Sequence, residues 1–144
     1  MDGHDKLKPY GLCISGVIDG FSRNMMWLAV FCTNNDPRII AGYYLEAVKN
    51  VGGAPAVVRA DMGTENGLVE VMQNALVGPN SFLYGLSTTN QRIESWWAFL
   101  RTHCVQYWID ILEDIKDNGL FTGDLLDKAL IQYCFTNIIQ VAVR

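Results

Sequence analysis

The feature that most constrains the fold of this chain is an apolar stripe that runs from residue 93 to residue 115. Its members recur every three or four residues, which places them on one face of a single long helix. They are Ile93, Trp96, Trp97, Leu100, Cys104, Tyr107, Trp108, Ile111, Leu112 and Ile115. Because so long an apolar face must be buried against another layer, we expect Trp97, Leu100, Cys104 and Trp108 to pack on a sheet.

The rest of the chain predicts short strands and helices in a mixed order. Residues 12–18 and 25–33 are apolar and flank a turn at 20–23, which predicts an antiparallel hairpin. Asp36 and Pro37 begin a helix that Gly52 ends. The remaining expected elements are a strand over 55–60, helices over 68–76 and 124–140, a short strand over 81–85 and a polar loop over 86–90. This order predicts an α/β architecture with helices on a mixed sheet.

The charge of the chain excludes one class of nucleic-acid binder. The sequence has 11 Lys and Arg against 15 Asp and Glu, so binding by bulk positive charge is disfavoured, whereas a local basic strip is not. The acidic excess lies between residues 110 and 128, where we expect a solvated surface. No apolar run reaches the roughly 18 residues that a membrane span needs, and the N-terminus is too polar for a signal peptide.

The cysteines predict neither a metal site nor disulfides. Cys13, Cys32, Cys104 and Cys134 form no C-x-x-C pair, and the two histidines lack zinc-finger spacing. Each cysteine lies in an apolar run, so we expect four buried free thiols in a reducing, intracellular compartment.

Two acidic residues stand where chemistry is often found in α/β proteins. Asp61 follows the apolar strand 55–60, and ligands gather at the carboxyl ends of such strands, although an Asp there can also serve a turn or cap. Glu94 lies in the first turn of the long helix, where the helix dipole alone favours an acid. Asp19 is expected to be a turn residue that hydrogen-bonds the backbone near Ser22.

Three stretches resemble the core domain of retroviral-type integrases and DDE transposases. They are Val17-Ile-Asp-Gly-Phe-Ser-Arg23, Val57-Val-Arg-Ala-Asp-Met-Gly-Thr-Glu-Asn66 and Thr88-Thr-Asn-Gln-Arg-Ile-Glu-Ser-Trp-Trp97. In particular, these stretches look like the integrase-core proteins of transposon origin found in animal genomes. The likeness covers residues 2–135, and 32 residues separate Asp61 from Glu94. We therefore expect a catalytic-core-like domain over 1–135 and a C-terminal tail over 136–144.

The resemblance implies a ribonuclease H-like fold, in which helices flank a five-stranded mixed sheet. It also implies an Asp–Asp–Glu triad that holds two divalent cations, Mg²⁺ or Mn²⁺. Asp61 matches the second Asp and Glu94 the Glu. Asp2, which lies 20 residues before Ser22, is the preferred first Asp, and Asp5, 17 before it, is the alternative. The strand that carries this Asp is expected to be truncated, because in the family it lies at the centre of the sheet and begins earlier.

A carboxylate triad suits the chemistry that the resemblance implies. Transfer of a DNA strand is an in-line displacement at phosphorus, in which two cations roughly 3.5–4 Å apart stabilise the attacking and leaving oxygens. Mg²⁺ is a hard ion that prefers carboxylate and phosphate oxygens, so a histidine or thiol triad would not suit it.

Five basic residues near these motifs are candidates for phosphate contacts, and each is otherwise an ordinary solvated side chain: Lys6, Lys8, Arg59, Arg92 and Arg101. Trp96 and Trp97 could stack on bases, but their place on the apolar stripe favours core packing. The sequence has no glycine-rich phosphate loop, so a nucleotide cofactor is not expected.

Two functions follow: a metal-dependent enzyme acting on DNA, with a nuclear location, or a non-catalytic integrase-derived DNA- or protein-binding module. The expected partner is DNA, a homodimer is left open, and a membrane is not expected.

Overall fold

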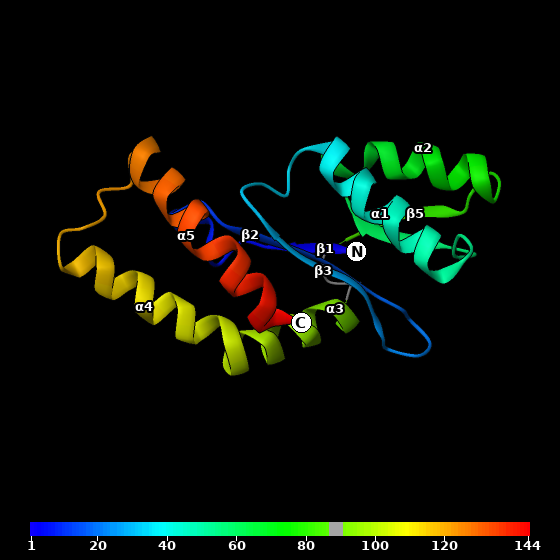
Figure 1. Cartoon of the computed structure of the whole chain (residues 1–144). Helices are drawn as coiled ribbons and strands as arrows, with labels where there is room; N and C mark the ends of the chain where they lie inside the picture. Colours follow the sequence, from blue (N-terminus) through cyan, green and yellow to red (C-terminus); the bar gives the residue numbers. More distant parts are fainter. Residues whose placement is uncertain (87–90) are drawn as a thin grey trace.

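The computed structural model in Figure 1 describes residues 1–86 and 91–144, and their fold is mixed α/β. The strands are β1 (Asp2–His4), β2 (Cys13–Ile18), β3 (Met25–Phe31), β4 (Val58–Asp61) and β5 (Phe82–Gly85). The helices are α1 (Pro37–Val51), α2 (Gly67–Leu76), α3 (Gln91–Leu100), α4 (Gln106–Asp117) and α5 (Leu125–Val143). The expected hairpin is confirmed as β2 and β3. Most of the polar loop expected over 86–90 lies outside the described residues.

The strands form two sheets. One is antiparallel with the order β1-β2-β3, and the other is the parallel pair β4-β5. A single five-stranded sheet is therefore not confirmed. Strand β1 is only three residues long and pairs with β2, and among the described residues no strand pairing joins it to β4. The Met1 amine donates to the carbonyl oxygen of Arg59 at 2.6 Å, and this hydrogen bond links the two sheets.

Helices α1 and α2 pack with β4 and β5 around one apolar core, which contains Ile40, Ala41, Tyr44, Val58, Ala60, Val69 and Phe82. Helix α1 begins as predicted, because the Asp36 side chain accepts a hydrogen bond from the backbone of Arg38, and it ends at Gly52 with φ of 83°. The buried Gln73 ties this layer together. It accepts from the Tyr44 hydroxyl at 2.6 Å and donates to the carbonyl oxygen of Pro55 at 2.6 Å.

Helices α3, α4 and α5 cover the three-stranded sheet and enclose the second core (Figure 1). The predicted long helix is confirmed as α3 and α4, joined without a break by a wider, π-helical turn over Arg101–Val105. Trp97, Leu100 and Trp108 are buried as expected, whereas Cys104 is only half-buried. The side chains of Thr102 and His103 each bond to a carbonyl four residues earlier, at 3.0 and 2.9 Å, within this turn.

The C-terminal helix α5 also lies along the free edge of β3. Gln140 accepts from the backbone N–H of Val30 at 2.7 Å and donates to the carbonyl oxygen of Leu28 at 2.9 Å. The residues expected as a tail, 136–144, continue this helix, and Ile139 and Val143 are buried. A side chain thus supplies β3 with the partners that another strand would otherwise provide.

The exposure of the cysteines corrects the expectation of four buried thiols, whereas the exposure of the acidic stretch confirms a prediction. Cys13 is buried, but Cys32 and Cys134 are exposed, because Cys32 follows the end of edge strand β3 and Cys134 lies on the solvent side of α5. The acidic stretch 110–128 is mostly exposed, as predicted. Among the described residues, no helix is both long and apolar enough to cross a membrane.

Candidate functional site

The carboxylate of Asp2 is held at both oxygens. Oδ1 accepts from the backbone N–H of Gly3 at 2.8 Å, and Oδ2 accepts from the indole Nε1 of Trp97 at 3.0 Å. Strand β1 positions Asp2 and helix α3 positions Trp97, so this hydrogen bond joins the first strand to the helix that carries Glu94. A charge-assisted hydrogen bond of this kind is stronger than a neutral one and fixes the rotamer of the carboxylate.

The Trp97 indole is itself fixed on both sides. Its ring stacks on His4 with 5.1 Å between centroids, and only 4% of the residue is exposed. A Cβ at Gly16 would lie 2.7 Å from the far edge of the indole, so the glycine of β2 provides the space that the ring occupies. Trp97 therefore acts as a rigid donor. Its packing role was predicted, but its bond to Asp2 was not.

The negative charges of Asp61 and Glu94 both act on the carboxyl group of Asp2. Burial raises the pKa of the Asp2 carboxyl, the hydrogen bonds from Trp97 and Gly3 lower it, and the negative charges of Asp61 and Glu94 raise it again. Burial lowers the pKa of the Met1 amine, while the charges of Asp2 and Asp61 raise it. Asp61 of β4 and Glu94 of α3 thus both lie within electrostatic range of Asp2 on β1.

Asp61 and Glu94 occupy the positions that the sequence predicted. Asp61 ends β4, and its carbonyl oxygen accepts from the side chain of the buried Asn66 at 3.3 Å, which folds the following loop back toward the strand. Glu94 is in the first turn of α3 and is exposed, three residues before Trp97 on the same helix. Asn66 was part of the motif but had no assigned structural role.

The alternative first acid, Asp5, has different partners. Its Oδ1 accepts from Asn34 at 2.7 Å, and its Oδ2 accepts from Lys8 at 3.0 Å, in an exposed ion pair. The negative charges of Asp61 and Glu94 act on Asp2, whereas the carboxylate of Asp5 is bonded to Asn34 and Lys8. Asp19 is a turn residue as expected, because its carboxylate accepts from the backbone N–H of Ser22 at 2.6 Å.

The donors of the proposed triad fit Mg²⁺ or Mn²⁺ chemically, but their positions do not yet form a ligand group. Within residues 1–86 and 91–144, no three His, Cys, Asp or Glu side chains are gathered closely enough to hold a metal ion. The three carboxylates are hard oxygen donors of the type these ions prefer. They would have to move together to bind one.

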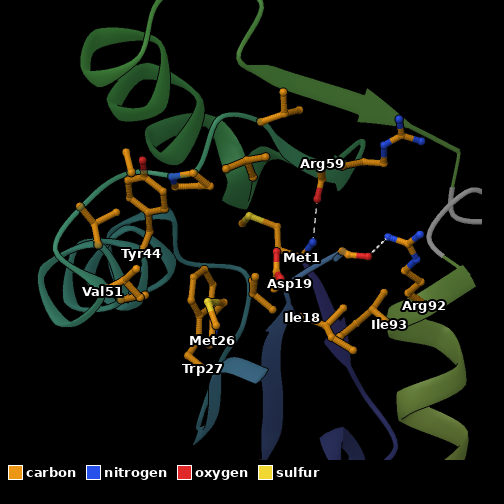
Figure 2. A pocket seen from close by; sticks show the side chains of 18 of the residues that line it. Met1, Ile18, Asp19, Met26, Trp27, Tyr44, Val51, Arg59, Arg92 and Ile93 are labelled. Atoms are coloured by element: carbon orange, nitrogen blue, oxygen red, sulfur yellow. Dashed lines mark hydrogen bonds between the residues drawn. The ribbon is translucent and has the colours of Figure 1, made fainter. Parts of the chain in front are cut away.

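The five basic candidates do not form one strip. Lys8 is paired with Asp5, and Arg92 donates to the carbonyl oxygen of Gly20 at the hairpin turn (Figure 2). Arg59 lies on β4 near Met1, at the cavity that Figure 2 shows. Burial lowers the pKa of His4, and the positive charges of Lys6 and Arg101 lower it further, which places these two cations near β1.

The two tryptophans differ in what they can contact. Trp97 is buried, so its face is not available to stack on a base. Trp96 is half-buried and packs with Phe99 at 5.4 Å between ring centroids. The expectation of core packing is therefore confirmed for Trp97, and Trp96, although only partly buried, packs against the same core.

The family model described as "Integrase core domain" matches residues 1–144, the whole chain. No curated protein matches the chain, and no solved structure does.

Proposed function

This chain belongs to the integrase core domain family, and from that premise we propose that it is a metal-dependent polynucleotidyl transferase core acting on DNA phosphodiesters. The observation that carries the proposal is that the negative charges of Asp61 and Glu94, from two other elements, both act on the carboxyl group of Asp2. Structural carboxylates on a protein surface are usually spread apart or paired with cations, so mutual repulsion at one place favours a functional site.

In this proposal the three acids have different tasks. Asp2 is the most rigidly held, because Trp97 and Gly3 fix both of its oxygens. Asp61 and Glu94 supply further carboxylate oxygens from the end of β4 and the start of α3. A bound pair of divalent cations would stabilise charge on the attacking and leaving oxygens during displacement at phosphorus. Since the carboxylates repel one another, cation binding would draw them together.

The proposal extends to the sheet and to the partners. Integrase cores are ribonuclease H-like, and the bond from Met1 to Arg59 supports a single mixed sheet in the order β3-β2-β1-β4-β5. DNA is the proposed partner, with Lys6 and Arg101 beside β1 and Arg59 and Arg92 beside β4 and α3 as phosphate contacts. A nuclear location follows if the substrate is chromosomal DNA.

The direct test is an assay of DNA nicking and strand joining in Mg²⁺ and in Mn²⁺. The unmodified chain should act on a labelled duplex, and Asp2→Asn, Asp61→Asn and Glu94→Gln should each abolish the activity. Asp110→Asn, which removes an exposed acid of α4, is the matched control and should retain it. Equal activity in Asp61→Asn and the unmodified chain would refute the triad.

A second candidate function is a non-catalytic, integrase-derived module that binds DNA or protein. The observation that favours it is the lack of a preformed metal-ligand group in the described part of the chain. A thermal melt separates the two functions. Mn²⁺ should raise the melting temperature of an enzyme core by mass action on the folded state, and Asp61→Asn should remove most of that rise. No shift for the unmodified chain would favour the non-catalytic module.

A further inference from the structure

The turn between β2 and β3 carries the most exposed of the large apolar side chains in the described part of the chain. Phe21 is 97% exposed, and Gly20, Ser22 and Arg23 beside it are exposed as well. Figure 1 shows this turn projecting away from the helices. A single exposed apolar residue is ordinary on a protein surface, so the ring is informative only together with the structure and charge of its turn.

Hydrogen bonds hold this turn in one conformation. The Asp19 carboxylate accepts from the backbone N–H of Ser22 at 2.6 Å, and the Ser22 hydroxyl accepts from that of Asn24 at 3.2 Å. The backbone N–H of Asp19 donates to Asn24 at 2.8 Å, and that of Arg23 donates to Asp19 at 3.0 Å. Phe21 lies between these contacts, so its ring is presented to solvent on an ordered backbone. A ligand that binds the ring therefore pays little to order the turn.

A tether joins the turn to the helix that carries Glu94. Arg92, in the first turn of α3, donates from its guanidinium to the carbonyl oxygen of Gly20 (Figure 2). A Cβ at Gly20 would lie 2.8 Å from Nη1 of Arg92, so the glycine allows this close approach. The tether keeps the exposed ring at a fixed place relative to the proposed active site.

The ring is close enough to the proposed active site to contact the same DNA strand. Asp2 pairs with Gly16 of β2, and Phe21 follows Gly16 by five residues. Five extended residues span at most about 17 Å. Successive nucleotides of one strand rise about 3.4 Å along a duplex, so this span corresponds to about five nucleotides or fewer.

The charges around the ring suit a nucleic-acid strand. Arg23 is exposed within the turn and Arg92 contacts it from α3, whereas Asp19 is the acid of the turn. Hydrogen bonds from the side chain and backbone of Ser22 lower the pKa of Asp19, so its negative charge is stabilised inside the turn. An exposed aromatic ring flanked by cations is the arrangement that binds single strands, because a base stacks on the ring while phosphates meet the cations.

We propose that Phe21 stacks on one unpaired base of the DNA substrate, within about five nucleotides of the phosphodiester that the proposed triad attacks. The inference rests on the proposed function and adds a substrate contact to it. A phenyl ring has no hydrogen-bonding group, so the contact tolerates any base. Because a base inside a paired duplex is covered on both faces by its neighbours, this contact selects DNA with a frayed or single-stranded end.

The experiment is a binding titration in Ca²⁺, followed by fluorescence anisotropy, with a labelled duplex that ends in a single-stranded overhang of about five nucleotides. Phe21→Ala should weaken binding about five- to hundredfold, the usual loss for one stacked base. Phe21→Tyr, which keeps an aromatic face, should bind as the unmodified chain does. Phe21→Leu keeps the apolar bulk without that face and should resemble Phe21→Ala. Tyr107→Ala, which removes an exposed ring of α4, is the matched control and should bind normally.

An abasic scan identifies the stacked base. Each base of the overhang is removed in turn while the sugar and phosphate are kept. At one position the loss should weaken binding by the unmodified chain but not by Phe21→Ala, which is the coupling that a double-mutant cycle detects. If every abasic substitution has the same effect on both proteins, the ring contacts no base and the proposal is overturned.

The outcomes separate this contact from the proposed function. Equal binding by Phe21→Ala and an unmodified chain that nicks DNA would overturn the stacking and leave the enzyme core in place. Normal binding by Phe21→Leu would also overturn it, since an apolar contact would then suffice. An unmodified chain that binds no DNA would overturn both proposals. Thermal melts of the variants check the fold, and we expect no shift because the ring of Phe21 is in solvent.

Discussion

At the scale of single residues, the contact that organises the candidate site is the hydrogen bond from Trp97 to Asp2. A sequence shows that Trp97 is on an apolar face, but it cannot show that the one polar atom of the side chain reaches a carboxylate 95 positions away. The bond depends on Gly16, which leaves room for the indole, and on His4, which stacks against it. Three different elements therefore set the position of one acid.

Trp97→Phe tests this contact, because it removes the N–H donor and keeps an aromatic ring against His4. Losing a hydrogen bond that lowers the pKa of Asp2 should raise that pKa and reduce unfolding free energy at neutral pH by about 1.5–3 kcal/mol. The carboxyl carbon of Asp2, followed by NMR against pH, measures the first effect, and urea denaturation measures the second.

Trp27→Phe is the matched control, since the Trp27 indole donates to the Ser15 hydroxyl at 3.2 Å and not to an acid. It should lower stability without changing the titration of Asp2. An unchanged Asp2 pKa in Trp97→Phe would show that the indole only packs.

Asp61→Asn tests the electrostatic contact within the proposed triad. The negative charge of Asp61 raises the pKa of Asp2, so removing it should lower that pKa. Native Asp2 keeps its proton to a higher pH than the unfolded chain does, so stability falls as pH rises from the unfolded pKa, near 3.9 for Asp, through the raised native value. In Asp61→Asn the pH interval between the unfolded and native pKa values of Asp2 narrows, so the free energy of unfolding falls by less.

The measurement is unfolding free energy across the acid range, in a metal chelator, together with the Asp2 titration. Asp110→Asn on α4 serves as a control for net charge. A pKa of Asp2 that moves equally in both variants would place Asp61 outside the site.

At the scale of elements, the sequence predicted those helices and strands that are stabilised by residues close to one another in the chain. The α1 boundaries followed from Asp36 and Gly52, whose cap and left-handed conformation need no distant partner. The hairpin followed from two apolar runs and a turn. Strand β1 could not be found in this way, because Asp2–His4 contains no β-branched or aromatic run and is extended only by pairing with β2. The π-helical turn at 101–105 also lacks a sequence signal.

Gln140→Leu tests how α5 protects the edge of β3. The variant removes both side-chain bonds to Val30 and Leu28 and leaves two backbone groups without these partners, at a cost of about 1–3 kcal/mol in unfolding free energy. Asn137→Leu, on the exposed side of the same helix, should have little effect. Urea midpoints at constant slope would measure the difference, and equal midpoints for the two variants would contradict the role of Gln140.

At the scale of the whole molecule, the proposed active site and the cavity share the same junction between sheets. Asp2 follows Met1 on β1, and Asp61 follows Arg59 on β4, so the two acids sit one and two residues beyond the bond that joins the sheets. A change in the bond between Met1 and Arg59 would therefore alter the spacing of Asp2 and Asp61.

The molecule also has an uncovered apolar surface on α5. One side of this helix, with Ile131, Ile139 and Val143, is buried in the core, yet the opposite side is apolar as well. Tyr133 is 87% and Val141 is 74% exposed, and Leu126 and Leu130 continue the same stripe. A helix that is apolar all round is normally buried all round, so we propose that a second copy of the chain covers this side.

Leu130→Glu combined with Val141→Glu tests that dimer. Burying two carboxylates against an apolar partner is costly, so the variant should remain monomeric at concentrations where the unmodified chain is a dimer, with little loss of monomer stability because both positions face solvent. Light scattering after size-exclusion chromatography, over a series of concentrations, measures the mass. Leu45→Glu, an exposed leucine of α1, is the control and should leave the dimer intact. A monomeric unmodified chain at every concentration would show that α5 does not form this contact.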